Sequence, residues 1–102
     1  MSISTHILDT ATGRPAANVA VRLEKESGAA VAEARTNDDG RIRWDFEVEP
    51  GIYRLVFDTG GYLGPDAFYP EASVTFRVAD PSGHLHVPLL LGPYSYTTYR
   101  GS

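Results

Sequence analysis

The sequence predicts an all-β fold, a sandwich or barrel built from about eight short strands. Apolar residues recur mostly at every second position, the spacing of strands with one buried face, and no window carries a helical stripe. Turn-forming residues interrupt the chain every ~8 to 15 positions, a rhythm typical of sandwiches and barrels. Because 102 residues is the length of one domain, we expect residues 1–102 to share a single hydrophobic core.

The first half of the chain predicts strands separated by polar turns. Asn37-Asp38-Asp39-Gly40 is the strongest turn signal, because Asn, Asp and Gly tolerate positive φ and short polar side chains satisfy turn amides. The strand that follows this turn has the clearest alternation, with Ile42 and Trp44 on one face and Arg41 and Arg43 on the other. The strands predicted here are residues 3–8, 19–24, 31–35 and 42–48.

The second half predicts strands at residues 52–58, 74–78, 84–91 and 94–100. Glycines and prolines punctuate residues 59–71, so we expect a loop there with at most one short helix. Pro88 cannot donate a hydrogen bond to a sheet, and its strand should therefore carry a bulge or an edge position at that point.

Composition excludes several classes of function. A chain without cysteine has no thiol chemistry, Cys-ligated zinc or iron–sulfur cluster, and no P-loop, dinucleotide or Gly-x-Ser-x-Gly motif occurs. The net charge of -4 with scattered basic residues disfavours nucleic acid. The longest apolar run is far short of the ~20 residues that span a bilayer, and no signal peptide or peroxisomal tripeptide is evident. We therefore expect a cytoplasmic protein without a membrane partner or a common cofactor.

Three histidines are the side chains that can exchange protons near neutral pH: His6, His84 and His86. His84 and His86 are two positions apart on one predicted strand, so both leave the same face about 6.6 Å apart. This spacing suits a shared catalytic pocket. It also suits a solvated strand face, or a zinc site that uses all three histidines.

Two further features allow either a structural or a functional interpretation. Arg41 follows the polar turn, where it can balance neighbouring aspartates or hold a carbonyl or anionic substrate. Tyr94, Tyr96 and Tyr99 run almost to the end of the chain, which suggests a buried terminus. They fit a last strand packed on the core and a site-lining segment equally well.

At these same residues the chain resembles the 5-hydroxyisourate hydrolases, the transthyretin-like family of purine catabolism. The resemblance covers essentially the whole chain, and the final tetrapeptide is its most specific element because hormone-carrying transthyretins lack it. One departure is the short, glycine-rich stretch at residues 59–66, where relatives often carry a longer helical segment. The matching segments are Thr5-His6-Ile7-Leu8-Asp9-Thr10, Thr12-Gly13-Arg14-Pro15-Ala16, Thr36-Asn37-Asp38-Asp39-Gly40-Arg41, Phe68-Tyr69-Pro70-Glu71, His84-Leu85-His86-Val87-Pro88-Leu89-Leu90-Leu91 and Tyr99-Arg100-Gly101-Ser102.

The resemblance implies a sandwich of two four-stranded sheets that assembles as a homotetramer with sites between subunits. It implies hydrolytic opening of the six-membered ring of 5-hydroxyisourate to 2-oxo-4-hydroxy-4-carboxy-5-ureidoimidazoline, without metal or cofactor. His6, Arg41 and His86 match the family's catalytic positions. The residues implied to bind substrate are His6, Arg41, Tyr99 and Ser102, with His84, Arg100 and Gly101 in support.

Three questions stay open at this point. Either His6 or His86 can act as the general base. A transthyretin-like binding protein would keep the sandwich and turn nothing over. A zinc-dependent hydrolase would use the three histidines as metal ligands.

Overall fold

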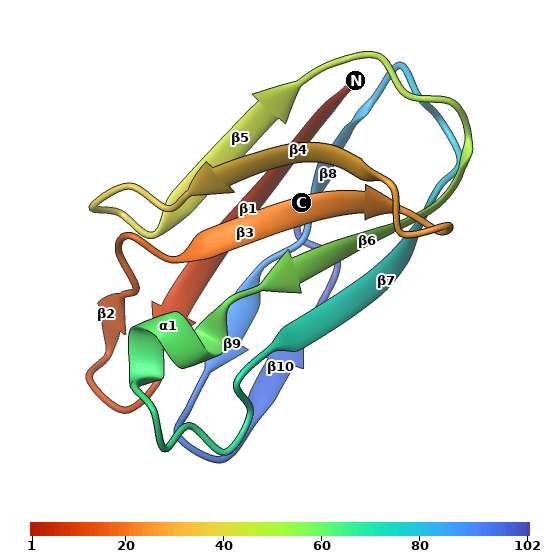
Figure 1. Ribbon diagram of the computed structural model, residues 1–102. Helices are drawn as coiled ribbons and strands as arrows, with labels where there is room; N and C mark the ends of the chain where they lie inside the picture. The colour runs from red at the N-terminus through yellow and green to blue at the C-terminus, as the bar shows by residue number, and fades with distance from the viewer.

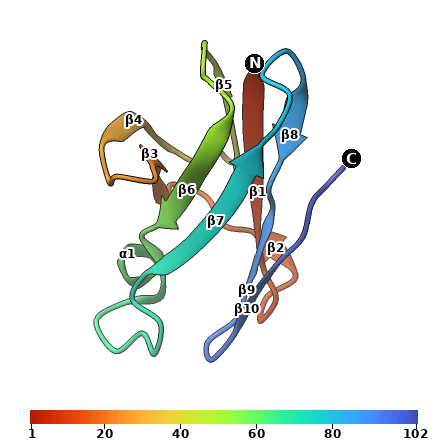
Figure 2. The same ribbon diagram turned by 90° about the vertical axis from the view of Figure 1, so that its right-hand side faces the viewer.

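Two β-sheets pack face to face in the computed structural model, which describes residues 1–102 (Figures 1 and 2). One helix caps the lower end of the sandwich in the view of Figure 1. The elements are β1 (Ser2–Asp9), β2 (Arg14–Pro15), β3 (Ala20–Lys25), β4 (Ala30–Arg35), β5 (Arg41–Asp45), β6 (Gly51–Phe57), α1 (Thr59–Leu63), β7 (Ala72–Val78), β8 (His84–His86), β9 (Leu89–Leu91) and β10 (Tyr96–Thr98).

The predicted sandwich of two four-stranded sheets is confirmed, with one refinement in the second sheet. The first sheet has the antiparallel order β4-β3-β6-β7. The second contains six strands, but they occupy four rows. β5 and the short β2 follow one another along one edge of β1, while β8 and β9 follow one another along its other edge, with β10 outside β9.

The core lies between the sheets and consists of inward-facing residues at every second strand position. Ile3 and Ile7 of β1, together with Leu55 and Phe57 of β6, have no exposed surface. Each such side chain contributes about 1.5–3 kcal/mol to the free energy of unfolding when fully buried. Alternation therefore leaves the intervening residues of β1, β5 and β8 on the outer face of the second sheet.

Pro88 interrupts the predicted strand 84–91, as its missing N–H requires. The chain leaves the ladder at Val87 and Pro88, which separates β8 from β9. The Val87 N–H still donates to the Ser4 carbonyl at 2.9 Å, and the Thr5 hydroxyl donates to the Val87 carbonyl at 2.7 Å. Both halves of the broken strand therefore stay parallel to β1.

Two predicted strands are longer than the observed ones. The strand predicted at 42–48 ends at Asp45, opposite Ser2, where β1 begins; the Phe46 N–H still donates to the Met1 carbonyl at 3.1 Å, in register with the ladder. The strand predicted at 94–100 is reduced to β10, because the 92–95 turn takes its first residues. β2 falls within the segment predicted as a turn.

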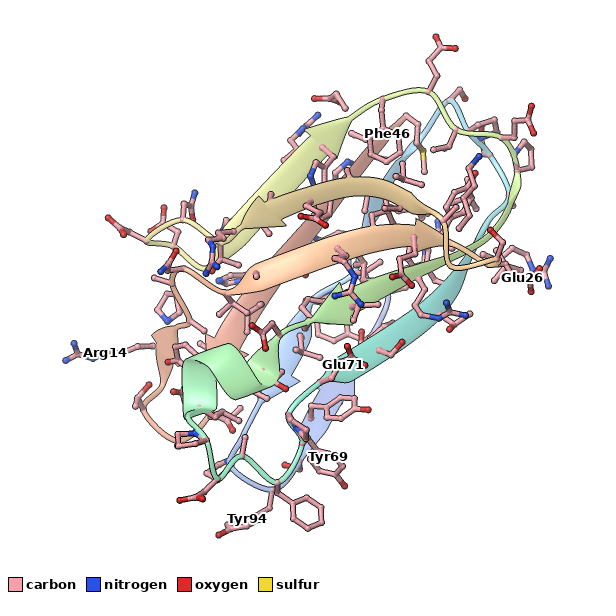
Figure 3. The ribbon with its side chains drawn as sticks, viewed as in Figure 1. Arg14, Glu26, Phe46, Tyr69, Glu71 and Tyr94 are labelled. Atoms are coloured by element: carbon pink, nitrogen blue, oxygen red, sulfur yellow. The ribbon has the colours of Figure 1, made fainter.

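The prediction of a buried aromatic terminus was wrong for the single chain. Tyr94 is 77% exposed and projects from the turn between β9 and β10 (Figure 3), and Tyr99 is 57% exposed. Tyr96 alone is half-buried, with its ring edge-on to Tyr69 at a centroid distance of 5.2 Å.

The predicted short helix is present as α1. Asp58 caps it, since its carboxylate accepts a hydrogen bond from the Gly61 N–H at 3.0 Å. The Tyr62 hydroxyl donates to the buried Asp9 carboxylate at 2.7 Å, which ties the helix to the end of β1. No helix in the chain has the length and apolar character needed to cross a membrane.

Candidate functional site

The candidate site begins with the outward-facing residues of β1. Ile3, Thr5 and Ile7 point inward and are fully buried, so Ser4 and His6 between them lie on the outer face. Ser2 shares this face and is only 7% exposed, because its neighbours on β5 and β8 cover it. β1 thus offers two hydroxyls and one imidazole to the strands on either side.

β8 places two histidines against the two serines. The parallel register sets Ser2 opposite His84 and Ser4 opposite His86. The Ser4 Oγ lies 2.7 Å from the His86 Nδ1 and 3.1 Å from the His84 Nε2, and the Ser2 Oγ lies 2.5 Å from the His84 Nδ1. The prediction that His84 and His86 share one face is confirmed by their common contact with Ser4.

On the opposite edge of β1, the turn before β5 fixes Arg41. The Asn37 side-chain oxygen accepts hydrogen bonds from the N–H groups of Asp39 and Arg41, each at 3.0 Å. Gly40 has φ +73°, and a Cβ there would meet the Ile7 carbonyl oxygen at 2.6 Å, so only glycine fits. After this turn, Arg41 pairs with His6 in the antiparallel ladder between β5 and β1.

The C-terminal segment closes the site from the outer edge of β8. After β10 the chain runs alongside β9 and β8 toward its end (Figure 2). The Gly101 N–H donates to the His86 carbonyl at 2.8 Å, and a Cβ on Gly101 would lie 2.4 Å from the His86 Cδ2. The absence of a side chain at Gly101 therefore lets the terminal segment pack against the imidazole.

These elements surround an open hollow of about 480 Å³ on the outer face of the second sheet, called here the histidine hollow. No carboxylate side chain lines it, whereas two arginines and two histidines do. Arg41 forms no ion pair with any acidic residue of the chain, so its charge is available to a ligand. The lining residues are Ser4, Thr5, Asn37, Arg41, Ile42, Arg43, His84, His86 and Ser102.

The surroundings of His86 favour its neutral form. Burial lowers the pKa of His86 below its ordinary value of 6.5, and the positive charges of Arg41, His6 and His84 lower it further. An interaction of the ring with the Ser4 backbone carbonyl opposes the shift without reversing it. His86 is therefore a neutral imidazole near pH 7, able to accept or donate a proton.

The structure brings together most, but not all, of the residues predicted as a site. His84, His86, Arg41 and Ser102 line the histidine hollow, and Gly101 packs behind His86. His6 does not line it, although it lies close enough for its charge to affect His86.

Tyr99 and Arg100 lie apart from this group. They line a separate hollow between β7 and β10, where Phe76 and Leu85 are among the other lining residues. Within one chain, then, the terminal tetrapeptide divides between two hollows.

Sequence reasoning missed Ser2, Ser4, Asn37 and Arg43. A signal for the serines was present, because Ser2 and Ser4 share the period-two face of His6. What the sequence does not contain is the parallel pairing of β8 with β1, which joins residues 80 or more positions apart.

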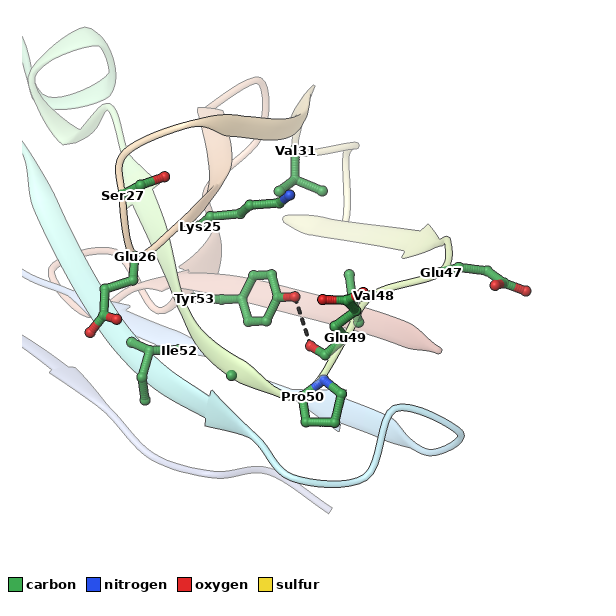
Figure 4. A pocket seen from close by; sticks show the side chains of 11 residues that line it. Lys25, Glu26, Ser27, Val31, Glu47, Val48, Glu49, Pro50, Ile52 and Tyr53 are labelled. Atoms are coloured by element: carbon green, nitrogen blue, oxygen red, sulfur yellow. Dashed lines mark hydrogen bonds between the residues drawn. The ribbon is translucent and has the colours of Figure 1, made fainter.

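A larger hollow of about 580 Å³ lies at the opposite end of β1 from α1, between the β3–β4 turn and the segment joining β5 to β6 (Figure 4). Glu26, Glu47 and Glu49 line it without any histidine. The buried Tyr53 hydroxyl already donates to the Glu49 carbonyl at 2.7 Å. This hollow offers no group that exchanges protons near neutral pH, so the histidine hollow is the better candidate.

The three-histidine zinc site considered from the sequence does not fit the structure. No three His, Cys, Asp or Glu side chains in the chain are placed so that they could hold a metal ion together. The Nδ1 atoms of His84 and His86 and the Nε2 of His84 contact serine hydroxyls instead.

Comparison with known proteins identifies relatives of the whole chain. The sequence profile of the HIUase/Transthyretin family matches residues 3–101. A 5-hydroxyisourate hydrolase from Salmonella dublin is 45% identical over 109 aligned positions, which cover 98% of this chain and 80% of the relative. The solved structure of Klebsiella pneumoniae 5-hydroxyisourate hydrolase superposes with a TM-score of 0.90 at 37% identity and covers 100% of both chains. Sea bream transthyretin in complex with thyroxine superposes with a TM-score of 0.83 at 34% identity, covering 97% of this chain and 93% of the other.

Proposed function

The chain belongs to the HIUase/Transthyretin family, and from this premise we propose that it hydrolyses 5-hydroxyisourate to 2-oxo-4-hydroxy-4-carboxy-5-ureidoimidazoline. One observation carries the proposal: a neutral imidazole and an arginine without a carboxylate partner line the same hollow. The relatives named as 5-hydroxyisourate hydrolases, with 45% and 37% identity, support the choice of substrate.

The reaction divides between a proton acceptor, a proton donor and a fixed positive charge. Water adds to a ring carbonyl carbon, the C–O bond forms and one proton of the water passes to a base. The adjacent C–N bond then breaks, and the ring nitrogen receives a proton from an acid. His6 and His86 are the imidazoles assigned to these two roles. Arg41 stabilises the negative charge that develops on the carbonyl oxygen.

The proposal extends to assembly and location. The histidine hollow is open, and Tyr99 is exposed beside a different hollow, so one chain does not enclose a substrate. In our proposal the site is completed between subunits of a homotetramer, where Tyr99 and Arg100 contact the planar ring together with Ser102. The reaction needs no metal or cofactor and takes place in the cytoplasm.

The test is the ultraviolet decay of freshly generated 5-hydroxyisourate with and without the protein. We expect decay to be faster with the wild-type chain, unaffected by EDTA, and to fall by about 10² to 10⁴ when His86 is replaced by Ala, the range of general acid–base groups. Binding of a small planar ligand without any turnover would instead indicate a binding protein, like the sea bream relative that was solved with thyroxine. Loss of activity on chelation, restored by zinc, would contradict metal independence.

A further inference from the structure

Ser2, His84, Ser4 and His86 form one continuous hydrogen-bonded chain on the outer face of the second sheet. The Ser2 Oγ contacts the His84 Nδ1, and the other nitrogen of the same ring contacts the Ser4 Oγ at 3.1 Å. The Ser4 Oγ also contacts the His86 Nδ1 at 2.7 Å. The His86 Nε2 has no protein partner and is not a buried unpaired atom, so it faces the open hollow.

The buried end of the chain sets the direction of these hydrogen bonds. The Ser2 Oγ has two partners, the Arg43 Nη2 at 3.5 Å and the His84 Nδ1. A guanidinium only donates, so the one acceptor available to the hydroxyl proton of Ser2 is the His84 Nδ1. Ser2 is 7% exposed, and a buried hydroxyl without an acceptor is costly.

The remaining protons follow in sequence from that first donation. A neutral His84 that accepts at Nδ1 carries its proton on Nε2 and donates it to the Ser4 oxygen. The Ser4 hydroxyl proton is then directed to its other partner, the His86 Nδ1. A neutral His86 that accepts at Nδ1 carries its own proton on Nε2, where it points into the histidine hollow.

We infer that Ser4 is a positioning residue that, through the chain Ser2–His84–Ser4–His86, holds His86 as the tautomer with its proton on Nε2. In the hydrolysis, His86 accordingly acts as a proton donor to the leaving ring nitrogen, and His6 is the general base. This assignment of roles rests on the proposed function, whereas the tautomer is a property of the free protein.

The tautomer is measured by ¹⁵N NMR of the imidazole rings, without substrate, at a pH where all three histidines are neutral. A His86→Gln variant assigns the signals. We expect the Nδ1 of both His84 and His86 to show the shift of an unprotonated, hydrogen-bonded nitrogen and Nε2 that of a protonated one. In Ser4→Ala, the His86 Nδ1 signal should move as its donor is lost, and Ser4→Thr, which keeps the hydroxyl, should restore it. A proton on the His86 Nδ1 of the wild type, or an unchanged Nδ1 signal in Ser4→Ala, would overturn the inference.

Turnover measurements test whether the hydrogen-bonded chain Ser2–His84–Ser4–His86 contributes to the reaction. We expect Ser4→Ala to lower kcat by about 10- to 100-fold with little change in KM, the size of effect seen when partners that orient an imidazole are removed. Ser2 does not line the hollow. A smaller loss of kcat in Ser2→Ala would therefore reflect the broken hydrogen-bonded chain and not a lost contact with substrate. Ser73→Ala, an exposed serine on the other sheet, is the matched control. A wild-type kcat in Ser4→Ala would contradict the positioning role. A wild-type protein without turnover would contradict only the proposed function, because the tautomer of His86 is measured by NMR without substrate.

Discussion

The charged side chains on the outer faces of the two sheets have different neighbours. On the β3–β6–β7 face, Glu24 contacts Arg22 at 3.1 Å and Arg54 at 3.4 Å, and Glu71 lies 3.7 Å from Arg22. On the β5–β1–β8 face, Arg43 pairs with Asp45 at 3.6 Å, Arg41 has no acidic partner, and His84 and His86 are hydrogen-bonded to serines. Each face contains an ion pair and an arginine without one, Arg77 on β7 and Arg41 on β5, but Arg41, unlike Arg77, lies beside a histidine whose pKa it lowers.

This difference separates a solvated surface from a site. Exposed ion pairs contribute about 0–1 kcal/mol and need no ligand to complete them. An arginine held by a turn and left without a carboxylate retains its capacity for an oxyanion or anionic substrate. The combination of this arginine with the serine-linked histidines distinguishes the histidine hollow as the candidate site.

Among the variants that compare the two faces, the largest effect is expected from removing the charge of Arg41. We expect Arg41→Gln to lower kcat/KM for 5-hydroxyisourate by about 10² or more, the usual cost of losing one group that stabilises an oxyanion. Arg22→Gln on the other face is the matched control and should retain wild-type kcat/KM, because its charge is taken up by Glu24. Equal losses in both variants, measured by ultraviolet decay of substrate, would show that the contrast between the faces has no bearing on catalysis.

A smaller effect is expected from crowding His86 without removing it. The Cβ of a Gly101→Ala variant would meet the His86 ring at 2.4 Å, so either the ring or the terminal segment must shift. We expect a loss of about 10- to 100-fold in kcat, since a misplaced imidazole transfers protons poorly. Gly83→Ala is the control, because a Cβ there meets nothing closer than 3.6 Å. Full activity of Gly101→Ala, with circular dichroism unchanged, would remove the terminal segment from the site.

The fold was predictable because its signals are local. The alternation in β1, β5 and β6 and the turn at residues 37–40 each lie within a short window, and they indicate which residues face inward. Strand ends were less predictable. The end of β5 at Asp45 follows from its pairing with Ser2 at the start of β1, a partner that no local pattern reveals.

The site was predictable only in part. The three histidines were candidates from their ordinary pKa, and the family resemblance implied catalytic roles for His6, Arg41 and His86. Strand periodicity placed His84 and His86 on one face. Ser4 and the closing contact of Gly101 required the parallel pairing of β8 with β1 and the return of the last residues to β8. The separation of Tyr99 from the histidines likewise depends on how the chain runs after β10.

A pH titration of His86 sharpens the comparison further. The folded pKa of His86 lies below 6.5, chiefly through burial and then through Arg41, so the unfolded chain binds this proton first as pH falls. This group therefore lowers the free energy of unfolding as pH drops from about 6.5 toward the folded pKa, and not above that range. NMR titration should give a higher His86 pKa in Arg41→Gln and no change in Arg22→Gln. An unshifted His86 in Arg41→Gln would contradict the electrostatic coupling.

The smallest effect is expected at the ion pairs that Glu24 makes on the β3–β6–β7 face. Glu24 accepts hydrogen bonds from both Arg22 and Arg54, and its side chain is 14% exposed, so Glu24→Gln weakens two pairs at once while keeping the shape of the residue. We expect the free energy of unfolding to fall by about 1 kcal/mol or less, because such pairs are screened by solvent. The difference should shrink further at high salt. Urea denaturation measures the change, with kcat recorded in parallel and expected to equal that of the wild type. A large loss of kcat in a variant that is still folded would mean that the two faces are coupled through the core, and the division between a solvated face and a functional face would have to be abandoned.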